Sequence, residues 1–209
     1  MKLTSQSFTD GGAIPGEFAF CIPATEGHVC LGRNLNPHLA WTAPPAGTRS
    51  FALICHDPDV PSHGGDANQE GRTVPATLAR VDFFHWVVVD LPGDLCEIAA
   101  GSFSDEVTPG GKPGLMGAHG SRLGINDYTA WFAGDEAMRG DYHGYDGPCP
   151  PWNDELLHHY EFTLYALDVE RCPIDGRFGG AEVRNAIAAH VLAEARLTGT
   201  YTLNPSLAA

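Results

Sequence analysis

The 209-residue sequence contains no long hydrophobic run and few basic residues, and each absence excludes a class of protein. No segment approaches the roughly twenty consecutive apolar residues that a membrane-spanning helix requires. Lysine and arginine number 12 against 26 aspartates and glutamates, so the formal net charge is −14. Binding to nucleic acid or to anionic lipid needs charge of the opposite sign. We therefore expect no nucleic-acid partner and no integral membrane association.

Signals for export and for paired cysteines are also missing. The first twelve residues, MKLTSQSFTDGG, lack the apolar stretch of a signal peptide. The cysteines are scattered singly with no CxxC pair, at Cys21, Cys30, Cys55, Cys96, Cys149 and Cys172. Without an export signal, free thiols are a simpler interpretation than disulfides. The sequence thus predicts a cytoplasmic protein in which none of the six cysteines is disulfide-bonded.

Apolar runs of strand length, separated by turn signals, indicate mainly β-structure. The runs at 50–56 and 160–168 have the length and residue types of strands. The run at 83–90 is rich in valine and aromatic residues, which is typical of a central strand buried on both faces. A shorter run at 198–203 is expected to be a closing strand.

One convincing helical pattern is present, and no regular alternation of strands and helices. Apolar residues recur three and four positions apart over 181–197, and Gly199 is expected to end that helix. One helix near the end of a strand-rich chain predicts a β-sandwich with a few peripheral helices. We expect residues 1–209 to form a single domain.

A long stretch, 99–154, consists largely of glycine, proline, aspartate and aromatic residues and predicts no clear element. Long loops within compact domains usually serve a function. This one ends in GYDGPCPP (144–151), whose three prolines stiffen the backbone directly before a predicted strand. We expect these prolines to form the wall of a pocket.

Two clusters near the predicted strands contain side chains suited to binding or catalysis. The motif HDPDVP (56–61) places aspartates and prolines alternately at a strand exit and indicates a rigid turn, which its own aspartates can stabilise. His85 lies within the apolar run FFHWVVV, where an imidazole is costly unless its ring nitrogens find partners. A core histidine with satisfied nitrogens is the simpler explanation for His85 taken alone.

A third cluster, LHHY (157–160), enters the next predicted strand. Strand alternation places His158 and Tyr160 on one face and His159 on the other. A pocket that contains Asp57, His85 and His158 follows only if the three strands are neighbours.

Together, these motifs resemble the phosphatidylethanolamine-binding protein family. The resemblance rests on CHDPDVP (55–61), FFHWVVV (83–89) and GPCPPWNDELLHHYEFTLYALD (147–168), which occur in this order. The segments GINDY (124–128) and AIAAHVLAEARLTGTY (186–201) are similar to the bacterial and archaeal branch, often called Raf-kinase-inhibitor-like.

The resemblance implies a Greek-key β-sandwich with a small anion-binding pocket and neither metal nor other cofactor. It also implies a cis peptide bond between Val60 and Pro61. The ligand-binding residues that it implies are Asp57, Asp59, Pro61, His85, Pro151, His158 and Tyr160. The sequence departs from the family pattern twice. His158-His159 stands where the family has a His-Arg dipeptide, and Trp152-Asn153-Asp154 replaces a glycine that often follows the double proline.

The main functional hypothesis is a non-catalytic binding protein for phosphorylated head groups like that of phosphatidylethanolamine, or for a small carboxylate. A phosphorylated residue of a regulated protein partner, as in kinase inhibition, is a further possibility, and the bacterial branch suggests a homodimer. Both pocket histidines can donate an N–H group to an oxyanion, with Asp57 favouring the protonated form of one of them. The pocket is then a locally positive spot, and binding should strengthen as the pH falls through the histidine range.

Two enzymatic alternatives remain open at this point. One carboxylate and two histidines are also the ligand set of iron and zinc sites, which indicates a metal-dependent enzyme as the alternative. A hydrolase with Cys55 or Cys149 as nucleophile requires an electropositive and partly exposed thiol.

Overall fold

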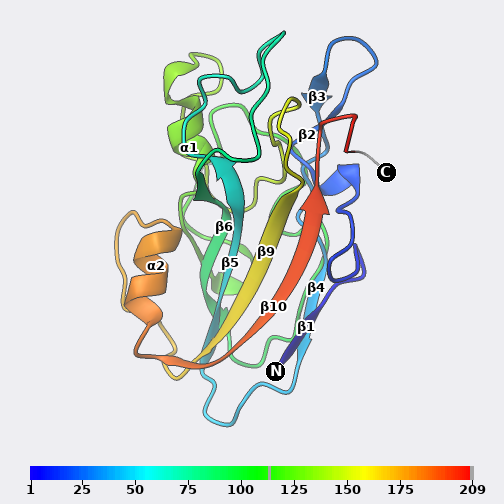
Figure 1. The fold of residues 1–209 in the computed structure, drawn as a ribbon. Coiled ribbons are helices and arrows are strands. Elements are labelled where there is room, and N and C mark those ends of the chain that lie inside the picture. Colours follow the sequence, from blue (N-terminus) through cyan, green and yellow to red (C-terminus); the bar gives the residue numbers. More distant parts are fainter. Residues whose placement is uncertain (113, 208–209) are drawn as a thin grey trace.

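The computed structural model describes residues 1–112 and 114–207, and strands make up most of its regular secondary structure (Figure 1). The strands are β1 (Lys2–Thr4), β2 (Cys21–Pro23), β3 (Val29–Leu31), β4 (Leu39–Thr42), β5 (Ser50–Pro61), β6 (Arg80–Pro92), β7 (Glu97–Ile98), β8 (Arg122–Leu123), β9 (His158–Leu167) and β10 (Val191–Tyr201). The α-helices are α1 (Tyr128–Trp131) and α2 (Gly180–Ile187), and single 3-10 turns lie at Gly16–Phe18, Ala118–Gly120 and Phe132–Gly134. Among the described residues, no helix has the length and apolar character needed to cross a membrane.

Strands β2 and β3 pair as a two-stranded ribbon, and the other strands form two sheets that enclose the main core. The larger sheet has the order β10-β9-β5-β6-β8, and the smaller has the order β1-β4-β7. Trp86 and Val88 of β6 pack in the core that the two sheets share, whereas Val87 and Val89 pack against Val183 of α2 in a second apolar cluster. Figure 1 shows α2 beside the larger sheet, on the side away from β1 and β4. The expected β-sandwich and the strand buried on both faces are confirmed.

Helix α2 is shorter than the sequence predicted. The predicted helix covered 181–197, but α2 ends at Ile187, and β10 then pairs with β9 as far as Tyr201. Burial alternates along β10, with Ala195 and Leu197 pointing inward, so a period of two fits the same residues as the helical period. Hydrogen bonding to β9 decides between the helical and the extended conformation. Gly199 lies within the strand, where a Cβ would come 2.4 Å from the nearest isoleucine side-chain atom.

The HDPDVP motif continues β5 rather than leaving the sheet. The pairing of β5 with β6 shifts register between Asp57 and Val60. Proline has no N–H group to donate, so Pro58 interrupts the ladder within this shift, whereas Pro61 pairs with Arg80. The Val60–Pro61 bond is trans, and the expected cis bond is therefore wrong.

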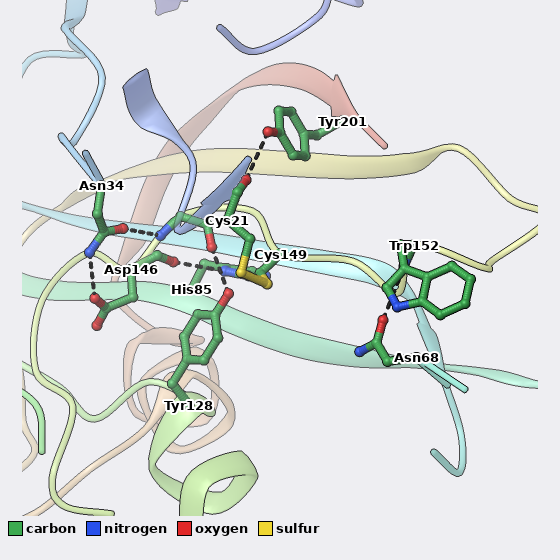
Figure 2. The surroundings of a disulfide bond; sticks show 10 residues. Cys21, Asn34, Asn68, His85, Tyr128, Asp146, Cys149, Trp152 and Tyr201 are labelled. Atoms are coloured by element: carbon green, nitrogen blue, oxygen red, sulfur yellow. Dashed lines mark hydrogen bonds between the residues drawn. A yellow bond between two sulfur atoms is a disulfide. The ribbon is translucent and has the colours of Figure 1, made fainter. Parts of the chain in front are cut away.

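A disulfide joins Cys21 of β2 to Cys149 of the GYDGPCPP motif (Figure 2). The two cysteines are 128 positions apart in the sequence, and their Cα atoms are 4.8 Å apart in the fold. The prediction that all six cysteines are free is therefore wrong, although Cys30, Cys55 and Cys96 are indeed unpaired, as is Cys172. Disulfides persist in oxidising compartments, so the cysteines no longer support the expected cytoplasmic location.

Candidate functional site

A cavity of about 240 Å³ lies at the end of the larger sheet where β5 ends and where β6 and β9 begin. Its lining includes the predicted residues Asp57, Pro61, His85, Pro151, His158 and Tyr160. Most of the remaining wall is apolar, and the long stretch 99–154 supplies much of it, including Tyr128 of α1. The fold thus brings together six of the seven residues that the sequence indicated.

Asp59 is the predicted residue that does not line the cavity. Its Oδ2 accepts hydrogen bonds from the backbone N–H of His159, at 2.9 Å, and from Nδ1 of the same residue, at 2.8 Å. Strand alternation would put Asp57 and Asp59 on one face, but the register shift between Asp57 and Val60 breaks the alternation. The opposite orientations of His158, which is fully buried, and His159, which is exposed, agree with the sequence.

His158 lies between two carboxylates. Its Nδ1 is 2.7 Å from Oδ2 of Asp57, and its Nε2 is 3.2 Å from Oδ2 of Asp154. Asp154 in turn receives two hydrogen bonds from the Arg80 guanidinium, at 2.6 and 3.0 Å. Burial opposes a charge on the imidazole, but the hydrogen bonds with Asp154 and Asp57 outweigh it and raise the pKa of His158 to about 9. His158 is therefore an imidazolium with both N–H groups engaged, and it has none left for a ligand.

His85 is in the opposite state. Its Nδ1 is 2.8 Å from the backbone carbonyl oxygen of Asp146 (Figure 2). A carbonyl oxygen only accepts, so Nδ1 carries the hydrogen. Burial, aided by the charge on His158, outweighs the attraction of Asp57 and lowers the pKa of His85 to about 4. The neutral ring therefore leaves Nε2 as a hydrogen-bond acceptor, and that atom has no partner among the described residues.

Tyr160 adds a donor to the same cavity. Its side chain is 1% exposed, and its hydroxyl is one of the buried polar atoms that lack a partner within the described part of the chain. Burial, and next the Asp57 carboxylate, raise the pKa of Tyr160 well above its usual value, so the phenol stays neutral. The polar floor, as we call Asp57, His85 and Tyr160 together, thus presents one O–H donor and two acceptors. The expectation of a locally positive pocket with two donating imidazoles is wrong.

Asp146 holds the carbonyl group that fixes His85, although no pattern in the sequence indicated this role. Its Oδ1 accepts from Asn34 Nδ2 at 2.7 Å and from Lys112 Nζ at 2.9 Å, and its Oδ2 accepts from Asn126 Nδ2 at 2.8 Å. Figure 2 shows the Asn34 contact together with the bond to His85. Asp146 lies in the GYDGPCPP motif, so the only available signal was an aspartate within a segment already expected to form a wall.

The departure Trp152-Asn153-Asp154 directly follows Pro150 and Pro151, which line the cavity. The indole of Trp152 stacks on the ring of His28, with centroids 3.5 Å apart. Asn153 accepts a hydrogen bond from the backbone N–H of Asn68 and donates to the carbonyl of Asp66. The Asn153 contacts tie the loop after β5 to the segment that leads into β9, and the Trp152 stack ties that segment to the turn between β2 and β3.

The enzymatic alternatives lack support from the geometry. In residues 1–112 and 114–207, no group of three or more histidine, cysteine, aspartate and glutamate side chains is placed to hold a metal ion. His158 illustrates the reason, because both of its ring nitrogens already contact carboxylates. Cys149 is in the disulfide, and burial raises the pKa of the fully buried Cys55 thiol well above its usual value. Neither cysteine has the exposed, electropositive setting of a nucleophile.

Comparisons with known proteins identify the family. Residues 4–202 match the family model described as phosphatidylethanolamine-binding protein. UPF0098 protein YbhB of Escherichia coli is 34% identical over 204 residues, which cover 97% of this chain and 100% of that protein. A UPF0098 protein of Methanothermobacter thermautotrophicus is 31% identical, covering 96% of this chain and 98% of its own. The crystal structure of E. coli YbcL, described as a new member of the mammalian PEBP family, matches with a TM-score of 0.67 at 26% identity, covering 96% of this chain and 97% of that one.

Proposed function

Because the chain belongs to the phosphatidylethanolamine-binding protein family, we propose that it is a non-catalytic binding protein whose cavity takes a small phosphorylated group. That group is part of a phosphorylated head group or belongs to a phosphorylated residue of a regulated protein partner. The observation that carries the proposal is the polar floor of Asp57, His85 and Tyr160 beneath apolar walls.

Unpartnered polar atoms in a buried cavity cost free energy unless a ligand or water satisfies them. The Tyr160 hydroxyl is such an atom, and His85 lines the same cavity with Nε2 free to accept, so a phosphorylated group can satisfy both. The apolar walls keep water away and so strengthen each hydrogen bond. The non-catalytic part of the proposal is supported by membership of a family described as binding proteins.

The test is titration calorimetry with phenyl phosphate, whose ring suits the apolar walls. His85→Ala should weaken binding by about 10- to 150-fold, which corresponds to one hydrogen bond to a charged ligand in a shielded site. His159→Ala is the matched control, because His159 points away from the cavity and its loss should leave the affinity unchanged. The proposal fails if phenyl phosphate does not bind, or if His159→Ala weakens binding as much as His85→Ala.

The Tyr160 hydroxyl allows a gentler test of the same proposal. Tyr160→Phe removes only the unpartnered oxygen and should also weaken binding of phenyl phosphate. Tyr165→Phe is its control, since Tyr165 lies on the same strand and packs in the cluster beneath α2, on the opposite face.

A further inference from the structure

We propose that the cavity binds a phosphorylated ligand in its singly protonated form, ROPO₃H⁻, and rejects oxyanions that carry no proton, such as a sulfate monoester. This inference rests on the proposed function and adds to it the chemical form of the ligand that the site accepts. It follows from the number of hydrogen-bond donors and acceptors in the polar floor.

Nε2 of His85 is the first acceptor of the polar floor. The backbone carbonyl of Asp146 takes the ring N–H, and the Asp146 carboxylate is itself held by Asn34 and Lys112. These contacts fix the His85 tautomer that carries its hydrogen on Nδ1 and leaves Nε2 without one. An oxyanion without a proton would place a lone pair against the lone pair on Nε2.

The Asp57 carboxylate is the second acceptor. Its Oδ1 accepts from the Asp59 backbone N–H at 2.8 Å, and its Oδ2 accepts from His158 at 2.7 Å. His158 itself offers nothing to a ligand, because its other N–H group points to Asp154. The charges of His158 and Arg80 are thus balanced by those of Asp57 and Asp154, so the cavity provides no net positive charge for a dianion.

The Tyr160 hydroxyl is the one donor of the polar floor. A singly protonated phosphate monoester matches this arrangement, because its P–O–H group can donate to Nε2 of His85 or to Asp57, while another of its oxygens accepts from Tyr160. A sulfate monoester has only acceptors at neutral pH. It can satisfy Tyr160, but it leaves both acceptors unpartnered.

The groups that face His85 are Asp57 of β5, His158 and Tyr160 of β9, Tyr128 of α1, and Asp146 behind the ring. The two histidines have pKa values of about 4 and about 9, outside the range in which a phosphate monoester takes up its second proton. Burial raises the pKa values of both tyrosines well above their usual value. A pH dependence near the second pKa of the ligand therefore reports the proton on the ligand.

The experiment is calorimetry on the full chain from about pH 5.5 to about 8, with phenyl phosphate, phenylphosphonate and phenyl sulfate. Since the second pKa of a phosphate monoester is about 6, the affinity for phenyl phosphate should fall about 50-fold between pH 6 and pH 8. Phenylphosphonate has a higher second pKa, so its midpoint should move up by the difference between the two ligands. Phenyl sulfate should bind at least about ten-fold more weakly than phenyl phosphate at pH 6.

Each contrary outcome has a distinct meaning. Equal affinity for phenyl sulfate, or an affinity for phenyl phosphate that does not change with pH, overturns the inference and leaves the proposed function intact. A common midpoint for phosphate and phosphonate places the proton on the protein and also overturns it. Binding of none of the three ligands overturns the inference and the proposed function together.

A variant gives a second readout. His85→Phe removes the acceptor but keeps a ring against Tyr128 and Tyr160, so the preference for phenyl phosphate over phenyl sulfate should shrink toward one. His159→Phe, on the exposed side of β9, should keep the wild-type preference. If His85→Phe does not fold, the three-ligand series on the wild-type chain decides the question alone.

Discussion

Replacing His158 with glutamine should remove most of the loss of stability that we expect as the pH rises from 6.5 to about 9. The folded-state pKa of His158 is about 9, whereas an unperturbed histidine titrates near 6.5. Below pH 6.5 the imidazole is protonated in both states, and its contacts with Asp57 and Asp154 stabilise the fold. Between 6.5 and 9 only the folded state keeps the proton, so the stability falls as the pH rises.

The magnitude follows from the two pKa values. The difference between 6.5 and about 9, at 1.36 kcal/mol for each pKa unit, corresponds to about 3 kcal/mol of unfolding free energy. Little of this is lost to solvent screening, because the His158 side chain is completely buried. Glutamine keeps a hydrogen-bond donor near the carboxylates but carries no charge. The wild type should therefore exceed His158→Gln by about 3 kcal/mol more at pH 6 than at about pH 9.5.

The assay is urea unfolding under non-reducing conditions, followed by far-UV circular dichroism and tryptophan fluorescence at several pH values. His159→Gln is the control, because an exposed ion pair such as His159–Asp59 contributes only about 0–1 kcal/mol. A stability difference between wild type and His158→Gln that is constant across the range would refute the reasoning. So would an NMR titration that places the pKa of His158 at or below 6.5.

Three further predictions concern His85 and the disulfide. The pKa of His85 is lowered to about 4, so the unfolded state binds more protons below pH 6.5, and stability should fall on acidification until pH 4. His85→Phe should reduce this fall in stability between pH 6.5 and pH 4 in the same urea assay. An unchanged fall in the variant would contradict the prediction. Alkylation of the denatured, unreduced protein should label four cysteines by mass spectrometry and six after reduction. Replacing Cys21 and Cys149 together by alanine should cost about 2–5 kcal/mol of stability, whereas Cys30→Ala at an exposed position should cost little; six labels without reductant would show that the disulfide is absent.

Local patterns in the sequence determined the strands and the orientation of side chains along them. The valine-rich run of β6 predicts burial on both faces, and Trp86 and Val87 are buried in different clusters. Alternation alone separated His158 from its neighbour His159. Both inferences hold because a strand turns successive side chains to opposite faces whatever surrounds it. The family motifs then indicated which of these side chains belong to one pocket.

The tertiary structure decided everything that depends on a distant partner. Residues 191–197 suit a helix or a strand, and only the hydrogen bonds offered by β9 favour the strand. The partner of Cys21 is 128 positions away, and the register shift that turns Asp59 out of the cavity exists only where β5 meets β6. The sequence likewise showed two similar pocket histidines. One is an imidazolium because two carboxylates surround it, and the other is neutral because it is buried with its N–H on a carbonyl group. The charge of a buried group depends on desolvation and on the atoms that surround it, and those exist only once the chain has folded.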